Sequence, residues 1–112
     1  YNPYLAAEAL VCGDTARYLR IIEGLRGEGE QPTFVLFALT SALFALQDGG
    51  RLFNKRLQDA VESAAGRFSR ARIDDAIAQA AGIDRAIKGV GTGDPWERFM
   101  TLGLKLSRGS KA

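Results

Sequence analysis

The residue types that most often carry out chemistry in proteins are scarce in this chain. It contains no histidine and a single cysteine, Cys12. The lack of histidine excludes Ser-His-Asp triads, Cys-His nucleophiles and histidine-ligated zinc. Cys12 has no imidazole to activate it and no second cysteine with which to form an internal disulfide. We therefore expect no catalytic residue, no metal site and no cofactor, and we expect Cys12 to have a packing role.

Two further patterns could suggest an active site, and both are explained better by structure. Gly89–Gly93 is rich in glycine, but a Walker A loop needs Gly-Lys-Ser/Thr and a dinucleotide fingerprint must follow a strand. The run instead follows a helical pattern, so we interpret it as a linker between helices. Asp74 and Asp75 lie at the start of a predicted helix, where negative charge offsets the helix dipole.

Basic residues gather in two short segments, Arg51–Arg56 around Phe53 and Arg67–Arg72 around Ser69. Arginines interleaved with aromatic residues are typical of surfaces that contact bases and phosphates. Acidic residues are interspersed, however, and 15 basic against 13 acidic residues leave a formal net charge of only +2. A small helical nucleic-acid-binding domain that uses these two clusters is therefore the alternative hypothesis.

Helix-start signals divide the chain into segments. Asp14 and Ser69 are predicted N-caps, and Pro32 stands at a predicted first helical position. The clearest start is Asp94-Pro95-Trp96-Glu97, which combines a capping carboxylate, a proline and a glutamate at the third position. Together with the hydrophobic spacing, these signals predict helices over about 3–12, 14–26, 32–46, 54–68, 69–87 and 95–107.

The composition and length fit one all-α domain. The chain has 112 residues, 46% of them hydrophobic, and no sustained alternation that would indicate a strand. We predict a compact bundle of five to six helices over residues 1–112. Tyr1 in place of a start methionine indicates a fragment of a longer protein. No run reaches the ~20 apolar residues of a membrane span, so we expect a soluble, cytoplasmic protein with no membrane partner.

The third predicted helix is apolar around nearly its whole circumference. Its residues from Phe34 to Leu46 include only Thr40 and Ser41 as polar positions. Such a helix is either wrapped on every side by others, or it buries one face in its own domain and another in a partner. The sequence leaves both interpretations open.

Two segments resemble a known family. Gly13–Pro32 (GDTARYLRIIEGLRGEGEQP) and Ile83–Trp96 (IDRAIKGVGTGDPW) resemble the C-terminal domain of the delta subunit of the bacterial DNA polymerase III clamp loader. Arg67–Ile77 and the closing helix from Trp96 follow the same pattern in the same order, so the likeness covers nearly the whole chain. The chain departs from the family at Gln47–Gly50, where the family has a longer connection.

The resemblance implies a helical collar domain through which clamp-loader subunits join into a ring. That complex loads the sliding clamp onto primed DNA in chromosome replication. The expected partners are the delta-prime and gamma/tau subunits. The sliding clamp would be contacted only by the N-terminal ATPase-like domains of the parent subunit, which lie outside this chain, and primer-template DNA only through the complex. The parent subunit belongs to the DNA polymerase III holoenzyme without a catalytic site of its own.

These expectations define two sets of residues. Candidates for the subunit interface are Phe34, Phe37, Phe44, Phe53, Arg56, Arg85 and Lys88. Candidates for structural roles are Asp14, Pro32, Ser69, Asp94, Pro95 and Trp96, and we expect Trp96 to be a core residue whose loss costs several kcal/mol.

Overall fold

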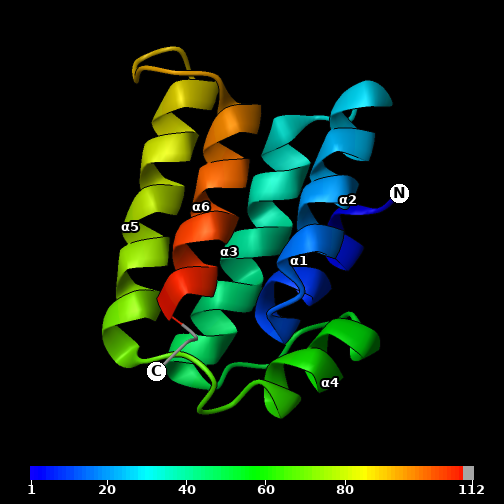
Figure 1. Cartoon of the computed structure of the whole chain (residues 1–112), viewed down its shortest axis with the longest axis vertical. Coiled ribbons are helices and arrows are strands. Elements are labelled where there is room, and N and C mark those ends of the chain that lie inside the picture. Colours follow the sequence, from blue (N-terminus) through cyan, green and yellow to red (C-terminus); the bar gives the residue numbers. More distant parts are fainter. Residues whose placement is uncertain (110–112) are drawn as a thin grey trace.

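The computed structural model describes residues 1–109, which form a helical globule (Figure 1). Its helices are α1 (Pro3–Cys12), α2 (Thr15–Gly27), α3 (Pro32–Asp48), α4 (Lys55–Ser63), α5 (Arg70–Ile87) and α6 (Pro95–Gly109). Six helices and no strand within this range confirm the predicted all-α bundle. In the part of the chain that the structure describes, no helix combines the length and the apolar character that a membrane crossing requires.

The predicted capping residues start the helices as the sequence indicates. A side-chain oxygen accepts a hydrogen bond of 3.2 Å from a backbone N–H of the following turn at each of Asp14, Ser69 and Asp94. Pro32 and Pro95 are the first residues of α3 and α6, where the missing N–H costs no helical hydrogen bond. These local signals explain why the bounds of α1, α2, α3 and α5 lie close to the predicted ones.

The main correction concerns α4, which ends at Ser63 and not at Phe68. The chain leaves the helix through a turn in which Gly66 has φ +83°, a conformation that favours glycine. Phe68 is nevertheless buried, whereas Ala65, within the predicted helix, is exposed. The helical spacing of apolar residues extends past the end of α4 because the turn brings Phe68 back to the core.

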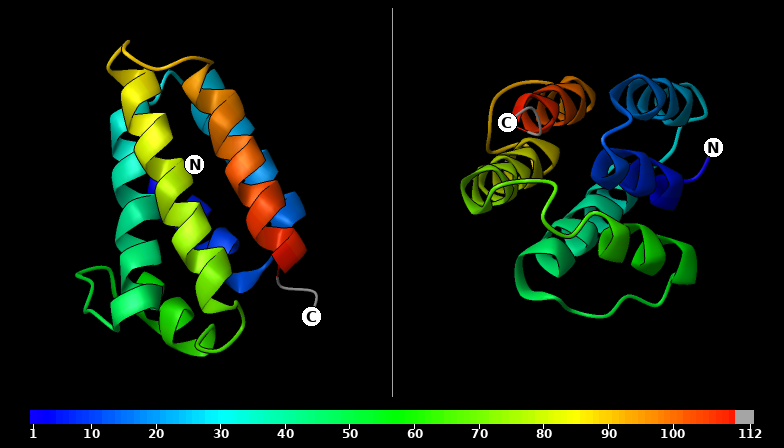
Figure 2. Two further views of the ribbon diagram at one scale, coloured as in Figure 1. Left: turned by 90° about the vertical axis from the view of Figure 1, so that its left-hand side faces the viewer. Right: turned by 60° about the horizontal axis from the view of Figure 1, so that its bottom comes forward.

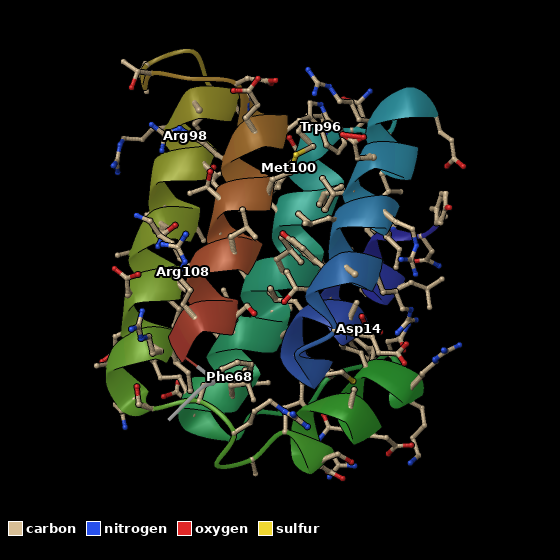
Figure 3. The ribbon with its side chains drawn as sticks, viewed as in Figure 1. Asp14, Phe68, Trp96, Arg98, Met100 and Arg108 are labelled. Carbon is tan, nitrogen blue, oxygen red and sulfur yellow. The ribbon has the colours of Figure 1, made fainter. Side chains whose placement is uncertain are left out.

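Smaller corrections concern single residues near the surface. Trp96 is only partly buried. It lies at the start of α6, close to α2 (Figure 3), and its ring meets that of Phe99 edge to face, with centroids 5.6 Å apart. Its loss should therefore cost less than that of a fully buried aromatic residue. In α6, the helical spacing of Trp96, Phe99, Met100, Leu104 and Leu106 predicts one apolar side; Leu104 is exposed instead, and Leu102 is fully buried. Cys12 is exposed, which contradicts its predicted packing role. Arg108–Ala112 is predicted as a polar tail after the last helix, but Arg108 lies within α6, and residues 110–112 lie outside the described residues.

Five of the helices pack in a closed ring. Going round it, α1 packs on α3, α3 on α5, α5 on α6, α6 on α2, and α2 on α1. Helix α4 crosses one end of this ring and packs on α1 and α3 (Figure 2). The core fills the centre, and α4 covers the outer side of α1, of which only Cys12 is exposed. The longer helices α2, α3, α5 and α6 keep outer sides that carry exposed residues.

A close contact in the core joins α2 to α6. Tyr18 of α2 is completely buried, and its hydroxyl donates a hydrogen bond of 2.7 Å to the carbonyl oxygen of Phe99. Its ring lies directly against Gly103 of α6, where a Cβ atom would overlap the ring. The lack of a side chain at Gly103 therefore lets the two helices approach.

The variant Gly103→Ala tests the close packing of α2 on α6. Because the added methyl group would displace the Tyr18 ring, we expect a loss of ~1–3 kcal/mol in the free energy of unfolding, measured by urea denaturation. Gly27→Ala is the matched control, since a Cβ at Gly27 would meet no atom within 4 Å. Equal stability of the two variants would contradict the packing described for Tyr18.

Burial of Tyr18 should also make the fold sensitive to alkali. Desolvation raises the pKa of Tyr18 well above its ordinary value near 10, so the folded chain keeps a proton that the unfolded chain loses. The stabilisation is complete below pH 10 and falls above it, by up to ~1.4 kcal/mol per pH unit. Urea denaturation at pH 9 and pH 11 measures this loss. Tyr18→Phe should show a smaller fall, and an identical fall would show that Tyr18 does not cause it.

Candidate functional site

Helix α3 is apolar on two sides, and only one of them is buried. The inner side packs in the core through Val35, Leu36, Ala38, Leu39, Ala42, Leu43 and Ala45. On the outer side, the exposed fractions of Phe34, Phe37 and Phe44 are 39%, 59% and 48%. The structure excludes the first interpretation of this helix, because α3 is not wrapped on every side.

A fourth exposed phenylalanine lies in the connection between α3 and α4. Phe53 is completely exposed, but the backbone beside it is held in place. The side-chain oxygen of the buried Gln58 accepts a hydrogen bond of 2.8 Å from the N–H of Leu52. On the other side of Phe53, Asn54 caps α4 by accepting from the N–H of Leu57 at 2.9 Å. Helix α4 therefore fixes both neighbours of Phe53.

An open groove of about 210 Å³ lies between this connection and α3. The residues that line it are Tyr4, Phe37, Ser41, Arg51, Leu52, Phe53, Asn54 and Leu57. Beside it, the ring of Tyr4 meets Phe34 edge to face, with centroids 5.6 Å apart. We call Phe34, Phe37, Phe44 and Phe53 the aromatic surface. It includes four of the seven predicted interface residues, and they lie on α3 and the connection that follows it.

Positive charge borders the groove on the α4 side. Arg51 has no ion-pair partner among residues 1–109. Lys55 bonds to Asp59 at 2.7 Å. The hydrogen bond to Asp59 and the charge of that carboxylate raise the pKa of Lys55, whereas the nearby charge of Arg51 opposes this shift. Asp59 thus neutralises Lys55, whereas Arg51 is the cation at this edge to which a further carboxylate would be attracted.

Arg56, another predicted interface residue, mainly joins helices of the domain. Its Nε lies 2.7 Å from Oε1 of Glu8, so it links α4 to α1. Arg17 of α2 approaches the same carboxylate oxygen at 3.8 Å. With only 14% of its side chain exposed, Glu8 anchors both arginines in this bridge.

The structure does not bring Arg85 and Lys88 to the aromatic surface. Both lie near the end of α5, at the opposite end of the molecule from α4 and the connection that carries Phe53 (Figure 1). Lys88 pairs with Asp84 of the same helix at 2.9 Å. These two residues therefore form no single site with the phenylalanines.

The second basic segment, Arg67–Arg72, lies at the α4 end of the molecule (Figure 1). Arg70 approaches Asp74 at 3.7 Å, whereas Arg67 and Arg72 have no ion-pair partner within residues 1–109. Both basic segments are thus at one end of the fold, but acidic neighbours neutralise part of each.

Of the residues that line the groove, sequence reasoning named Phe37 and Phe53 as interface candidates and Arg51 as part of a basic segment. It missed Tyr4, Ser41, Leu52, Asn54 and Leu57. Ser41 could have been found, because it continues the spacing of Phe34, Phe37 and Phe44 on one helix face. Tyr4 and Leu52 carry no such signal, since α1 and the α3–α4 connection meet α3 only in the folded chain.

Among the described residues, no three His, Cys, Asp or Glu side chains are grouped so that they could hold a metal ion. Comparison of the chain with protein-family models, with curated proteins and with solved structures gave no match.

The aromatic surface should contribute little to folding. Because the Phe53 side chain is completely exposed, we expect Phe53→Ala to change the free energy of unfolding by less than ~0.5 kcal/mol. Phe68→Ala is the matched comparison and should cost ~3–5 kcal/mol, since Phe68 is only 6% exposed. Chemical denaturation measures both. A cost of several kcal/mol for Phe53→Ala would mean that this residue is part of the core.

Proposed function

We propose that this chain is a subunit-assembly module, the collar domain of a protein similar to the delta subunit of the bacterial DNA polymerase III clamp loader. The observation that supports an assembly role is the aromatic surface, in which four phenylalanines remain in water on one helix and the adjoining connection. Exposed apolar patches of this kind mark sites of association. The clamp-loader assignment itself comes from the resemblance of Gly13–Pro32 and Ile83–Trp96 to that family.

In this proposal the partners are the delta-prime and gamma/tau subunits, and the domain takes part in no chemical step. Burial of the phenylalanines supplies most of the binding free energy, as aromatic residues do at the centre of many interfaces. Arg51 and Lys55 form a polar rim beside them. The role in DNA replication and the cytoplasmic location follow from membership of such a complex.

The test is assembly with purified delta-prime and gamma/tau subunits. We expect Phe37→Glu to weaken binding at least ~10-fold, because a charged carboxylate would have to be buried in an apolar contact. Its free energy of unfolding should change by less than ~0.5 kcal/mol, since Phe37 is mostly exposed in the free domain. Analytical ultracentrifugation and chemical denaturation measure the two effects.

Ala16→Glu is the matched control, because it adds the same charge at an exposed position of α2, a helix that contacts α1 and α6. It should assemble as the wild type does. Normal assembly of Phe37→Glu would exclude the aromatic surface as the interface. Steep loss of affinity for primer-template DNA with added salt, without subunit assembly, would favour the alternative of a nucleic-acid-binding domain that uses Arg51–Arg56 and Arg67–Arg72.

A further inference from the structure

The outer side of α3 has the residue spacing of a helix-pairing seam. Phe34, Phe37, Ser41 and Phe44 are separated by three, four and three residues. Residues at this spacing lie in one line along a helix and contact a second helix that runs beside it. Ser41 is the one small member, so a gap interrupts the line of aromatic rings.

The gap at Ser41 opens into the groove. Ser41 and Phe37 line it from α3, and Leu52 and Phe53 line it from the connection to α4. Its volume of about 210 Å³ is several times the ~30 Å³ that one water molecule occupies in the liquid. The groove is therefore wide enough for a large side chain from outside the domain, and its lining offers that side chain apolar contacts.

The charges at the edge of the groove favour one class of partner. Arg51 lines the groove and has no ion-pair partner within the described range, whereas Lys55 beside it is paired with Asp59. None of the described residues that line the groove is acidic. A partner with a carboxylate beside its apolar side chain would pair with Arg51, whereas a basic partner would be repelled by it.

We propose that the groove at Ser41 receives one large apolar side chain from a helix of a partner subunit, and that a carboxylate flanking this side chain faces Arg51. The inference rests on the proposed function, and it adds the mode of contact. The partner helix lies along Phe34, Phe37 and Phe44, and the side chain that enters at Ser41 fixes the register of the two helices. Ser41 is thus a specificity-determining residue of the interface.

Ser41→Leu tests the groove without removing apolar surface. The leucine side chain would occupy the space into which the partner residue must enter, so binding to the gamma/tau and delta-prime subunits should fall at least ~10-fold. Ser41→Ala leaves the groove open and should bind as the wild type does. Denaturation curves for both variants should match the wild type, because position 41 lies at the surface of a helix and both replacements favour helix.

The outcomes separate this inference from the proposed function. If Phe37→Glu disrupts assembly while Ser41→Leu and Ser41→Ala assemble equally well, the groove is not used, although the aromatic surface is. If Ser41→Leu fails to assemble and Ser41→Ala succeeds, the groove receives a partner side chain.

A second measurement does not depend on affinity. Ser41→Cys in a Cys12→Ala background, which removes the exposed native thiol, can be modified with a maleimide in the free domain and in the assembled complex. We expect modification to slow more than ~10-fold on assembly, because the partner side chain would cover the thiol. An unchanged rate in the complex would overturn the inference. Protection that depends only on the concentration of the chain itself would overturn the heterologous partner and assign the groove to a second copy.

Discussion

The geometry of the helix ring determines which side chains stay in water. A helix in the closed ring of α1, α3, α5, α6 and α2 has one neighbour on each side and the core in front of it. Its outer side is covered only where another element crosses, and α4 crosses only one end. Helix α4 covers the outer side of the short helix α1, of which only Cys12 is exposed. Helix α3 is longer and meets α4 only near one end, so its outer side stays in water with Phe34, Phe37 and Phe44.

The close packing of α2 on α6 depends on the lack of a side chain at Gly103. Gly103 costs α6 ~1 kcal/mol of helix propensity relative to alanine. In return, the ring of Tyr18 packs against the backbone of α6 and its hydroxyl reaches the carbonyl oxygen of Phe99. A wider spacing would leave that hydroxyl buried without a partner, a cost of ~1–3 kcal/mol. The close approach is thus favoured by both packing and hydrogen bonding.

Most of the fold could be predicted from the sequence because its signals are local. Asp14, Ser69, Asp94 and the two helix-starting prolines act within one turn of their own position, and the structure confirms them. Phe68 shows the limit of such reasoning. Its spacing from Val61 is helical, yet the turn at Gly66 brings it into the core from outside the helix. The spacing of apolar residues therefore predicts which residues are buried, but it does not predict that the helix continues as far as the last of them.

The candidate site was predictable only in its helical part. The exposed phenylalanines of α3 follow from composition, whereas the groove depends on how α4 holds the connection before it. Gln58 is the decisive residue, because its side-chain oxygen binds the N–H of Leu52, and no pattern in the sequence indicates that contact. This bond holds Leu52 at the groove, whose other walls come from α3, from Tyr4 of α1 and from Leu57 of α4. A flat face binds many apolar surfaces about equally, whereas a groove of defined width selects one side chain at one register. Fixing the connection through a buried amide therefore favours specific pairing over general adhesion.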